Sequence, residues 1–172
     1  MKLLHTIRDT LLGIIGGAAV ILLAFMTVVG TWQIVSRYVF NRPSTVSEEL
    51  LTYSFAWMAL LSSAYVFGKR DHMRMGFLAD KAGERARRFL GVAADVCAFA
   101  FAAVVMVYGG VEITRLTMTQ VTASLQIPMG YIYVILPAAG FLIMFFSLVN
   151  ACDVLTGAYS GIWRDGKEAE KA

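Results

Sequence analysis

Apolar residues fill four long stretches of the chain, and charged residues gather between them. The stretches cover residues 11–35, 50–67, 89–111 and 127–149. A hydrocarbon core of about 30 Å needs roughly 20 apolar helical residues to cross it, and each stretch approaches or exceeds that length. They lack the two-residue alternation of barrel strands and are far longer than such strands. The pattern therefore predicts an all-α integral membrane protein with four transmembrane helices in a single domain, residues 1–172.

The first apolar stretch follows a basic start, MKLLHTIRDT, as the core of a secretory signal would. A cleaved signal has an apolar core of about 7 to 15 residues and a small-residue cleavage site. Here the apolar stretch runs from residue 11 to residue 35 and leads into GTWQIVSRY. We expect a retained first helix.

Composition agrees with a membrane protein. The chain of 172 residues is 58% hydrophobic and 16% charged, and its mean hydropathy is +0.66. These values lie outside the usual range of soluble domains.

The positive charges predict the orientation in the membrane. Twelve of the 15 Lys and Arg residues lie before the first helix, in the 68–88 loop or after the fourth helix; the other three are Arg37, Arg42 and Arg115. The positive-inside rule then places both termini, the 68–88 loop and the polar 156–172 tail in the cytoplasm. The net charge of +3 is attributed to this topology and to lipid contact, because no nucleic-acid-binding motif is present.

The 68–88 loop is predicted to contact lipid. Apolar residues alternate with charged ones around Met73 to Leu78, which favours a short amphipathic helix lying in the interface between the second and third helices. A solvated basic loop is the alternative. The residues expected to meet lipid or its headgroups are Lys69, Arg70, Arg74, Phe77, Arg87 and Arg88.

The apolar stretches offer little to carry a polar solute. Those of the first, second and fourth helices contain no charged residue, whereas transporters place polar groups near the midplane. Asp95 lies about 9 Å along the third helix from residue 89, and a packed carboxylate is favoured there over a proton relay. Pro137 should kink the fourth helix. Gly13 and Gly17 form a GxxxG motif whose neighbour could belong to this chain or to another.

The sequence contains no pattern that indicates an enzyme or a cofactor site. No triad spacing is recognisable, so no catalytic residue is assigned and the chain is predicted not to be an enzyme. His5 and His72 are the only histidines and lie outside the apolar stretches, which argues against haem. Cys97 and Cys152 are expected to be free thiols. No cofactor or metal site is predicted.

Residues 35–57, VSRYVFNRPSTVSEELLTYSFAW, place two arginines and two glutamates between apolar stretches. Asn41 and Pro43 are expected to end the first helix and turn the chain. Thr45 and Glu48 fit a T-x-x-E capping box, and acidic residues suit the positive start of a helix. A capped interfacial turn explains the carboxylates as well as a functional site does.

The same segment carries a resemblance to a known family. RYVFNRPSTVSEELLTYSFAW, then GKRDHMRM, then SLQIPMGYIYVILPAAG resemble the small membrane subunit of tripartite ATP-independent periplasmic (TRAP) transporters, of the DctQ or SiaQ type. Val46 stands where that family usually has Trp. The matching residues, within about 30–150, are Arg37, Tyr38, Phe40, Asn41, Pro43, Glu48, Glu49, Trp57, His72, Ile127, Pro128, Pro137 and Gly140.

The resemblance implies a subunit that does not itself bind substrate. Such a subunit acts as a bracket for a large sodium-coupled membrane subunit that moves as an elevator, while a periplasmic substrate-binding protein delivers the solute, usually a carboxylate. An orphan four-helix scaffold or assembly factor is the second hypothesis, and an autonomous small transporter the third. Residues expected at the large-subunit interface are Arg37, Tyr38, Asn41, Pro43, Glu48, Glu49 and Trp57.

The predicted outer face has two short connections, 36–47 and 112–130, so a periplasmic partner would have to meet them. The segment TRLTMTQVTASLQ is uncharged after Arg115, and it offers hydrogen bonds without the cost of burying an ion. A solvated loop is equally compatible with these residues. The residues expected to dock the binding protein are Arg42, Arg115, Thr119, Gln120 and Ser124.

Overall fold

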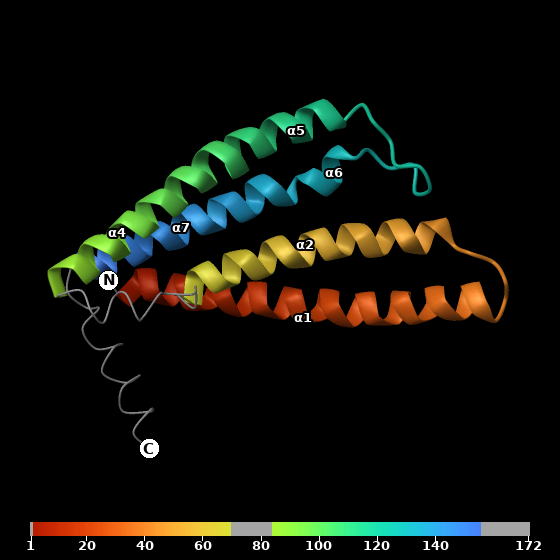
Figure 1. Cartoon of the computed structure of the whole chain (residues 1–172), viewed down its shortest axis with the longest axis horizontal. Helices are drawn as coiled ribbons and strands as arrows, with labels where there is room; N and C mark the ends of the chain where they lie inside the picture. Colours follow the sequence, from red (N-terminus) through yellow and green to blue (C-terminus); the bar gives the residue numbers. More distant parts are fainter. Residues whose placement is uncertain (1, 70–83, 156–172) are drawn as a thin grey trace, which may run out of the picture.

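The structure, a computed structural model, describes residues 2–69 and 84–155, and these residues are almost entirely helical (Figure 1). Two short connections join the helices, and one isolated antiparallel bridge links Val121 to Pro128. The elements are α1 (Lys2–Tyr38), α2 (Thr45–Lys69), α4 (Glu84–Phe101), the π-helix η1 (Ala102–Gly109), α5 (Gly110–Thr117), α6 (Gly130–Tyr133) and α7 (Ile135–Leu155).

Within residues 2–69 and 84–155, four helical segments are long and apolar enough to cross a membrane, which confirms the predicted fold class. They cover Thr6–Tyr38, Thr45–Lys69, Gly91–Thr117 and Gly130–Cys152. The predicted amphipathic helix falls mostly within residues 70–83 and the polar tail within 156–172, so both lie outside the described residues, as do Arg70, Arg74 and Phe77. The backbone of Arg87 and Arg88 belongs to α4.

The third span is one continuous helical rod whose middle is a π-helix. α4, η1 and α5 follow one another without a break from Glu84 to Thr117. Hydrogen bonds in a π-helix join residues five apart, and this wider winding was not predicted from the sequence. Gly109 and Gly110 mark its end.

The fourth span is interrupted near its start, close to the predicted proline kink. α6 ends at Tyr133 and α7 begins at Ile135. Pro137 has no N–H to donate to the carbonyl four residues earlier, that of Tyr133, and its ring crowds that turn. The interruption therefore lies within one turn before the proline.

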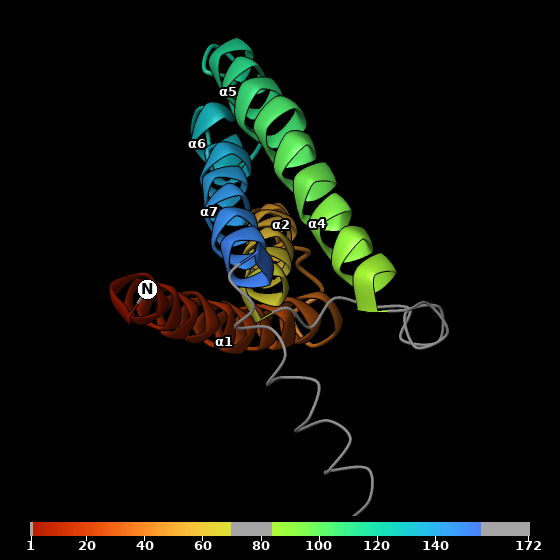
Figure 2. The ribbon, with the colours of Figure 1, turned by 90° about the vertical axis from the view of Figure 1, so that its left-hand side faces the viewer.

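α7 is the central helix of the described structure. It packs against α2 on one side and against α4 and η1 on the other, whereas α1 packs chiefly on α2 (Figure 2). The largest core cluster joins Ala64 of α2, Met106 of η1 and Ile143 of α7. A second cluster brings Leu12 of α1 against Phe146 of α7.

Glycines allow a close helix crossing between the η1–α5 junction and α7. A Cβ on Gly110 would lie 2.9 Å from Cδ of Pro137, and one on Gly140 would lie 2.8 Å from Cβ of Met106. Neither position has space for a side chain, so these contacts set the distance between the third and fourth spans. Pro137 and Gly140 are thus part of a helix-packing surface.

Asn150 ties α7 to the far end of α2. Its side chain is 2% exposed, and Nδ2 donates to the carbonyl oxygen of Phe67 at 3.1 Å. That carbonyl lies in the last turn of α2, where main-chain acceptors lose their helical partners. The hydrogen bond satisfies a buried amide and a helix-end carbonyl together.

Candidate functional site

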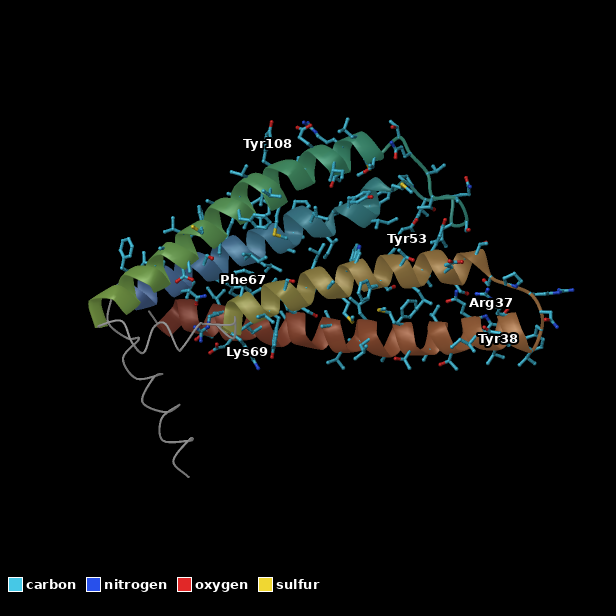
Figure 3. The ribbon with its side chains drawn as sticks, viewed as in Figure 1. Arg37, Tyr38, Tyr53, Phe67, Lys69 and Tyr108 are labelled. Atoms are coloured by element: carbon cyan, nitrogen blue, oxygen red, sulfur yellow. The ribbon has the colours of Figure 1, made fainter. Side chains whose placement is uncertain are left out.

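Most of the predicted interface and docking residues gather at one end of the bundle. We call it the loop end, and it comprises the 39–44 turn and the 118–129 connection. Arg37 and Tyr38 lie beside the turn, at the right of Figure 3. Arg115 lies in the last turn of α5, just before the 118–129 connection. Trp57 lies further down α2.

The 39–44 turn is closed by hydrogen bonds to the last turn of α1. Oγ of Ser36 donates to the carbonyl oxygen of Arg42 at 2.7 Å, and the N–H of Arg42 donates to the carbonyl oxygen of Ser36 at 3.1 Å. Asn41 has a φ of 52°, a left-handed conformation that asparagine tolerates better than most residues. The predicted chain reversal at Asn41 and Pro43 is confirmed.

Ser44, and not Thr45, caps α2. Its Oγ accepts a hydrogen bond from the N–H of Ser47 at 3.3 Å and lies 3.0 Å from Oγ of Ser47. The helix begins at Thr45, so the predicted T-x-x-E box was placed one residue too late. Glu48 is exposed and remains near the positive start of the helix.

Glu49 joins α2 to the 118–129 connection through both of its oxygens. Oε1 accepts from the N–H of Ser124 at 2.9 Å, and Oε2 accepts from the N–H of Leu125 at 3.1 Å. Two consecutive N–H groups thus donate to one carboxylate. Such charge-assisted hydrogen bonds are stronger than those between neutral groups. The connection and the start of α2 are held as one unit.

The 118–129 connection also holds its own shape. The N–H of Thr122 donates to the carbonyl oxygen of Ile127 at 2.9 Å, and that of Met129 to the carbonyl oxygen of Gln120 at 2.8 Å. Oγ1 of Thr122, a fully buried residue, accepts from the N–H of Ile127 at 3.3 Å. Gln126 adopts a φ of 54° at the tip. The connection is a structured loop.

Trp57 makes a second link between α2 and the fourth span. Its Nε1 donates to the carbonyl oxygen of Ile132 at 3.0 Å, within α6 and just before the interruption at Val134. A membrane offers no water to satisfy such an indole, so this bond anchors the half-buried ring. The polar atoms of Trp57 and Glu49 are therefore engaged within this chain.

The other predicted interface residues are open to the surroundings. Tyr38 is 74% exposed, and Arg37, Asn41, Pro43 and Glu48 are also exposed. Within the described residues, the side chains of these five residues make no hydrogen bond to the rest of the chain.

The predicted docking residues differ in how exposed they are. Arg42, Thr119 and Gln120 are exposed. Arg115 is also exposed, and its Nη1 lies 4.0 Å from Oε1 of Glu112. Ser124 is half-buried, and its N–H donates to Glu49. Elsewhere, Asp95 is half-buried on α4 and has an interaction partner.

The sequence did not reveal that Glu48 and Glu49 have different environments. Both were assigned to the same interface, yet Glu48 is exposed and Glu49 is hydrogen-bonded to a loop 75 residues further along the chain. The available signal was the helical spacing of Glu49 with Trp57, eight residues apart and so close to one face of α2. That face meets α6 and the 118–129 connection.

Comparison with known proteins points to one family. The family model described as tripartite ATP-independent periplasmic transporters, DctQ component, matches residues 26–157. The sialic acid TRAP transporter small permease protein SiaQ of Vibrio cholerae is 29% identical over 163 residues, which cover 93% of this chain and 92% of that protein. A putative TRAP transporter small permease protein of Haemophilus influenzae is 32% identical over 60 residues, 35% of this chain and 37% of that protein.

Proposed function

The chain belongs to the DctQ-component family of TRAP transporters, and from this premise we propose that it is a bracket that supports the fixed part of the large membrane subunit. As a small permease subunit it is a transporter component and not an enzyme. The large subunit would bind the solute and the coupling sodium ions. This chain would bind neither.

The poor burial of α1 carries the proposal. Only 6% of the α1 span is buried within the chain, the same share as for the α2 span, against 39% for the span that contains α7. Unlike α2, which packs against both α1 and α7, α1 packs chiefly on one helix. The half of α1 next to the loop end bears an open groove of about 350 Å³ lined by Thr27, Val28, Thr31, Trp32 and Val35. Small and polar side chains at a helix surface favour close helix association in membranes. A large membrane partner would cover this face.

We place the large-subunit contact at the loop end and along α1. Arg37, Tyr38, Asn41, Pro43 and Glu48 are exposed there and would form its polar part. Glu49 and Trp57 would support the surface from within, since their polar atoms bond this chain.

Arg37→Ala should reduce co-purification of a co-expressed TRAP large subunit from the same bacterium by about tenfold, because loss of one member of a partly dry polar contact leaves its partner unpaired. Arg115→Ala is the matched control, as it removes another exposed arginine at the same end. Yield in the membrane should be unchanged for both variants. Equal recovery of the large subunit with both would remove Arg37 from the interface.

The orientation follows from the charge pattern: we propose that both termini face the cytoplasm and the loop end faces the periplasm of the inner membrane. In a chain with Cys97→Ser and Cys152→Ser, an impermeant maleimide added to whole spheroplasts should label Ser44→Cys and Ala123→Cys but not Gly83→Cys. Labelling of Gly83→Cys alone would show that the topology is the reverse of the proposed one.

We further propose that exposed residues of the loop end help to dock the binding protein. Arg42 and Arg115 are charges at the rim, where they chiefly affect the encounter rate. Thr119, Gln120 and Ser124 lie on the connection that Glu49 holds in place, although the backbone of Ser124 is already engaged.

Arg42→Glu combined with Arg115→Glu should raise the binding-protein concentration for half-maximal uptake about fivefold at low salt, and less at high salt, because screening weakens rim charges. The measurement is a titration of binding protein into proteoliposomes that hold both membrane subunits. Arg42→Lys with Arg115→Lys is the control. An unchanged midpoint at both salt concentrations would exclude these arginines from docking.

The solute is proposed to be a carboxylate taken up with sodium. The relative from Vibrio cholerae is named a sialic acid transporter, and an acidic sugar is one member of that class. Uptake by the whole transporter should require a sodium gradient and be inhibited by excess carboxylate but not by a neutral sugar; inhibition by both would reject the class.

A further inference from the structure

A groove opens between α1 and α2 at the end of the bundle opposite the loop end. Its volume is about 470 Å³, and it is lined by Asp9, Leu12, Gly13, Gly16, Gly17, Tyr65 and Lys69. Lys69, labelled in Figure 3, is the last residue of α2.

Three glycines of α1 line the groove. A Cβ on Gly13 or on Gly17 would find no atom of the described chain within 4 Å, whereas one on Gly16 would lie 3.1 Å from the ring of Tyr65. The GxxxG neighbour left open by the sequence is therefore absent from the described residues. Tyr65 forms one wall, and the two open glycines expose bare backbone beside it.

The rim of the groove carries charges of both signs. The side chain of Asp9 is 67% exposed, and its Oδ1 lies 3.4 Å from Nε of Arg8. Nζ of Lys69 lies 4.9 Å from the ring centroid of Tyr65. The groove is therefore charged at its mouth and apolar further in.

Depth in the membrane matches this division. The α1 span has 33 residues, about 50 Å of helix, which exceeds a hydrocarbon core of about 30 Å. Its ends therefore reach the headgroups. Asp9 lies near the start of that span and Lys69 ends α2, at a level where a tyrosine is favoured. Gly13 and Gly17 lie one to two turns deeper, at the level of the acyl chains.

We propose that this groove binds one phospholipid with a primary-amine headgroup, such as phosphatidylethanolamine. Lys69 contacts the phosphate, the carboxylate of Asp9 accepts hydrogen bonds from the ammonium group, and an acyl chain covers Gly13 and Gly17. The two rim charges complement the two headgroup charges and remain hydrated. A partner helix over the same groove would have to desolvate both rim charges, at a cost that its own groups would have to offset.

Native mass spectrometry of the full-length chain, in a detergent that releases lipid, tests the proposal by titration with defined phospholipids. We expect one saturable phosphatidylethanolamine site, with phosphatidylcholine bound about fivefold more weakly because its quaternary amine cannot donate to Asp9. Asp9→Asn should abolish this preference. Lys69→Gln should weaken both lipids about fivefold through the lost phosphate contact.

Gly13→Leu adds a side chain to the groove at a position where a Cβ has no atom of the described chain within 4 Å, and it should weaken phosphatidylethanolamine binding about tenfold. Gly91→Leu is its control, since Gly91 on α4 also has nothing within 4 Å of an added Cβ. Circular dichroism and gel filtration check that each variant is folded.

Three outcomes would overturn the proposal. One is non-saturable binding, or equal affinity of the unaltered chain for both lipids. Another is an unchanged affinity in Gly13→Leu. The third is loss of the lipid adduct when the co-purified large subunit is present, together with a disulfide from Gly13→Cys to that subunit, which would identify a protein helix as the occupant.

Discussion

Replacing Glu49 with alanine is expected to release the 118–129 connection from α2. The variant removes the acceptor of two N–H groups, those of Ser124 and Leu125. A hydrogen bond to a charged group contributes about 1.5 to 3 kcal/mol, so the loss should be at least about 2 kcal/mol. Hydrogen exchange at these two amides, measured by mass spectrometry, should accelerate by roughly thirtyfold or more.

Glu48→Ala is the matched control, because it removes a neighbouring carboxylate that is exposed and makes no contact with the connection. Its exchange rates at 118–129 should equal those of the unaltered chain. Glu49→Gln should resemble the alanine variant, since an amide offers one acceptor and turns a donor toward the other N–H. Similar exchange in Glu48→Ala and Glu49→Ala would show that the carboxylate does not hold the connection.

Gly110→Ala is expected to separate the third and fourth spans. The added methyl group would lie 2.9 Å from Cδ and 3.0 Å from the nitrogen of Pro137, and neither the ring nor the backbone can move aside independently. Overpacking of this kind costs about 1 to 3 kcal/mol. The free energy of unfolding, measured with denaturant in detergent micelles, should fall by that amount.

Gly109→Ala separates this steric effect from helix propensity. A Cβ at Gly109 has its nearest atom, the carbonyl oxygen of Val104, at 3.7 Å, an ordinary contact. This variant should be neutral or more stable by about 0.5 to 1 kcal/mol, as expected for Gly to Ala in a helix. Equal destabilisation by both substitutions would show that loss of glycine itself, and not the approach of Pro137, sets the stability.

Hydrophobic pattern alone was enough to predict the four spans, because a membrane requires long apolar helices and little else has that pattern. The turn at Asn41 and Pro43 was predicted for a similar reason, since these residues carry local conformational preferences. The interruption near Pro137 followed from its missing N–H. Each of these features depends on residues within about one helical turn.

Features that depend on distant residues could not be predicted. Glu49 and Ser124 are 75 residues apart, as are Trp57 and Ile132, and no local pattern links them. Whether Ser44 or Thr45 caps α2 depends on a shift of one residue in where the helix begins, and sequence patterns locate helix ends least precisely. The π-helix η1 has the same apolar composition as an α-helix and so left no separate signal.

The most direct test of the account compares sodium-driven uptake in three sets of proteoliposomes, each supplied with the binding protein of the same transporter. One set holds this chain, one holds the large membrane subunit, and one holds both. A bracket without a solute pathway predicts no uptake by the chain alone, and full uptake only where both subunits are present and co-purify as a complex. Uptake by the chain alone, or undiminished uptake by the large subunit without it, would contradict the account.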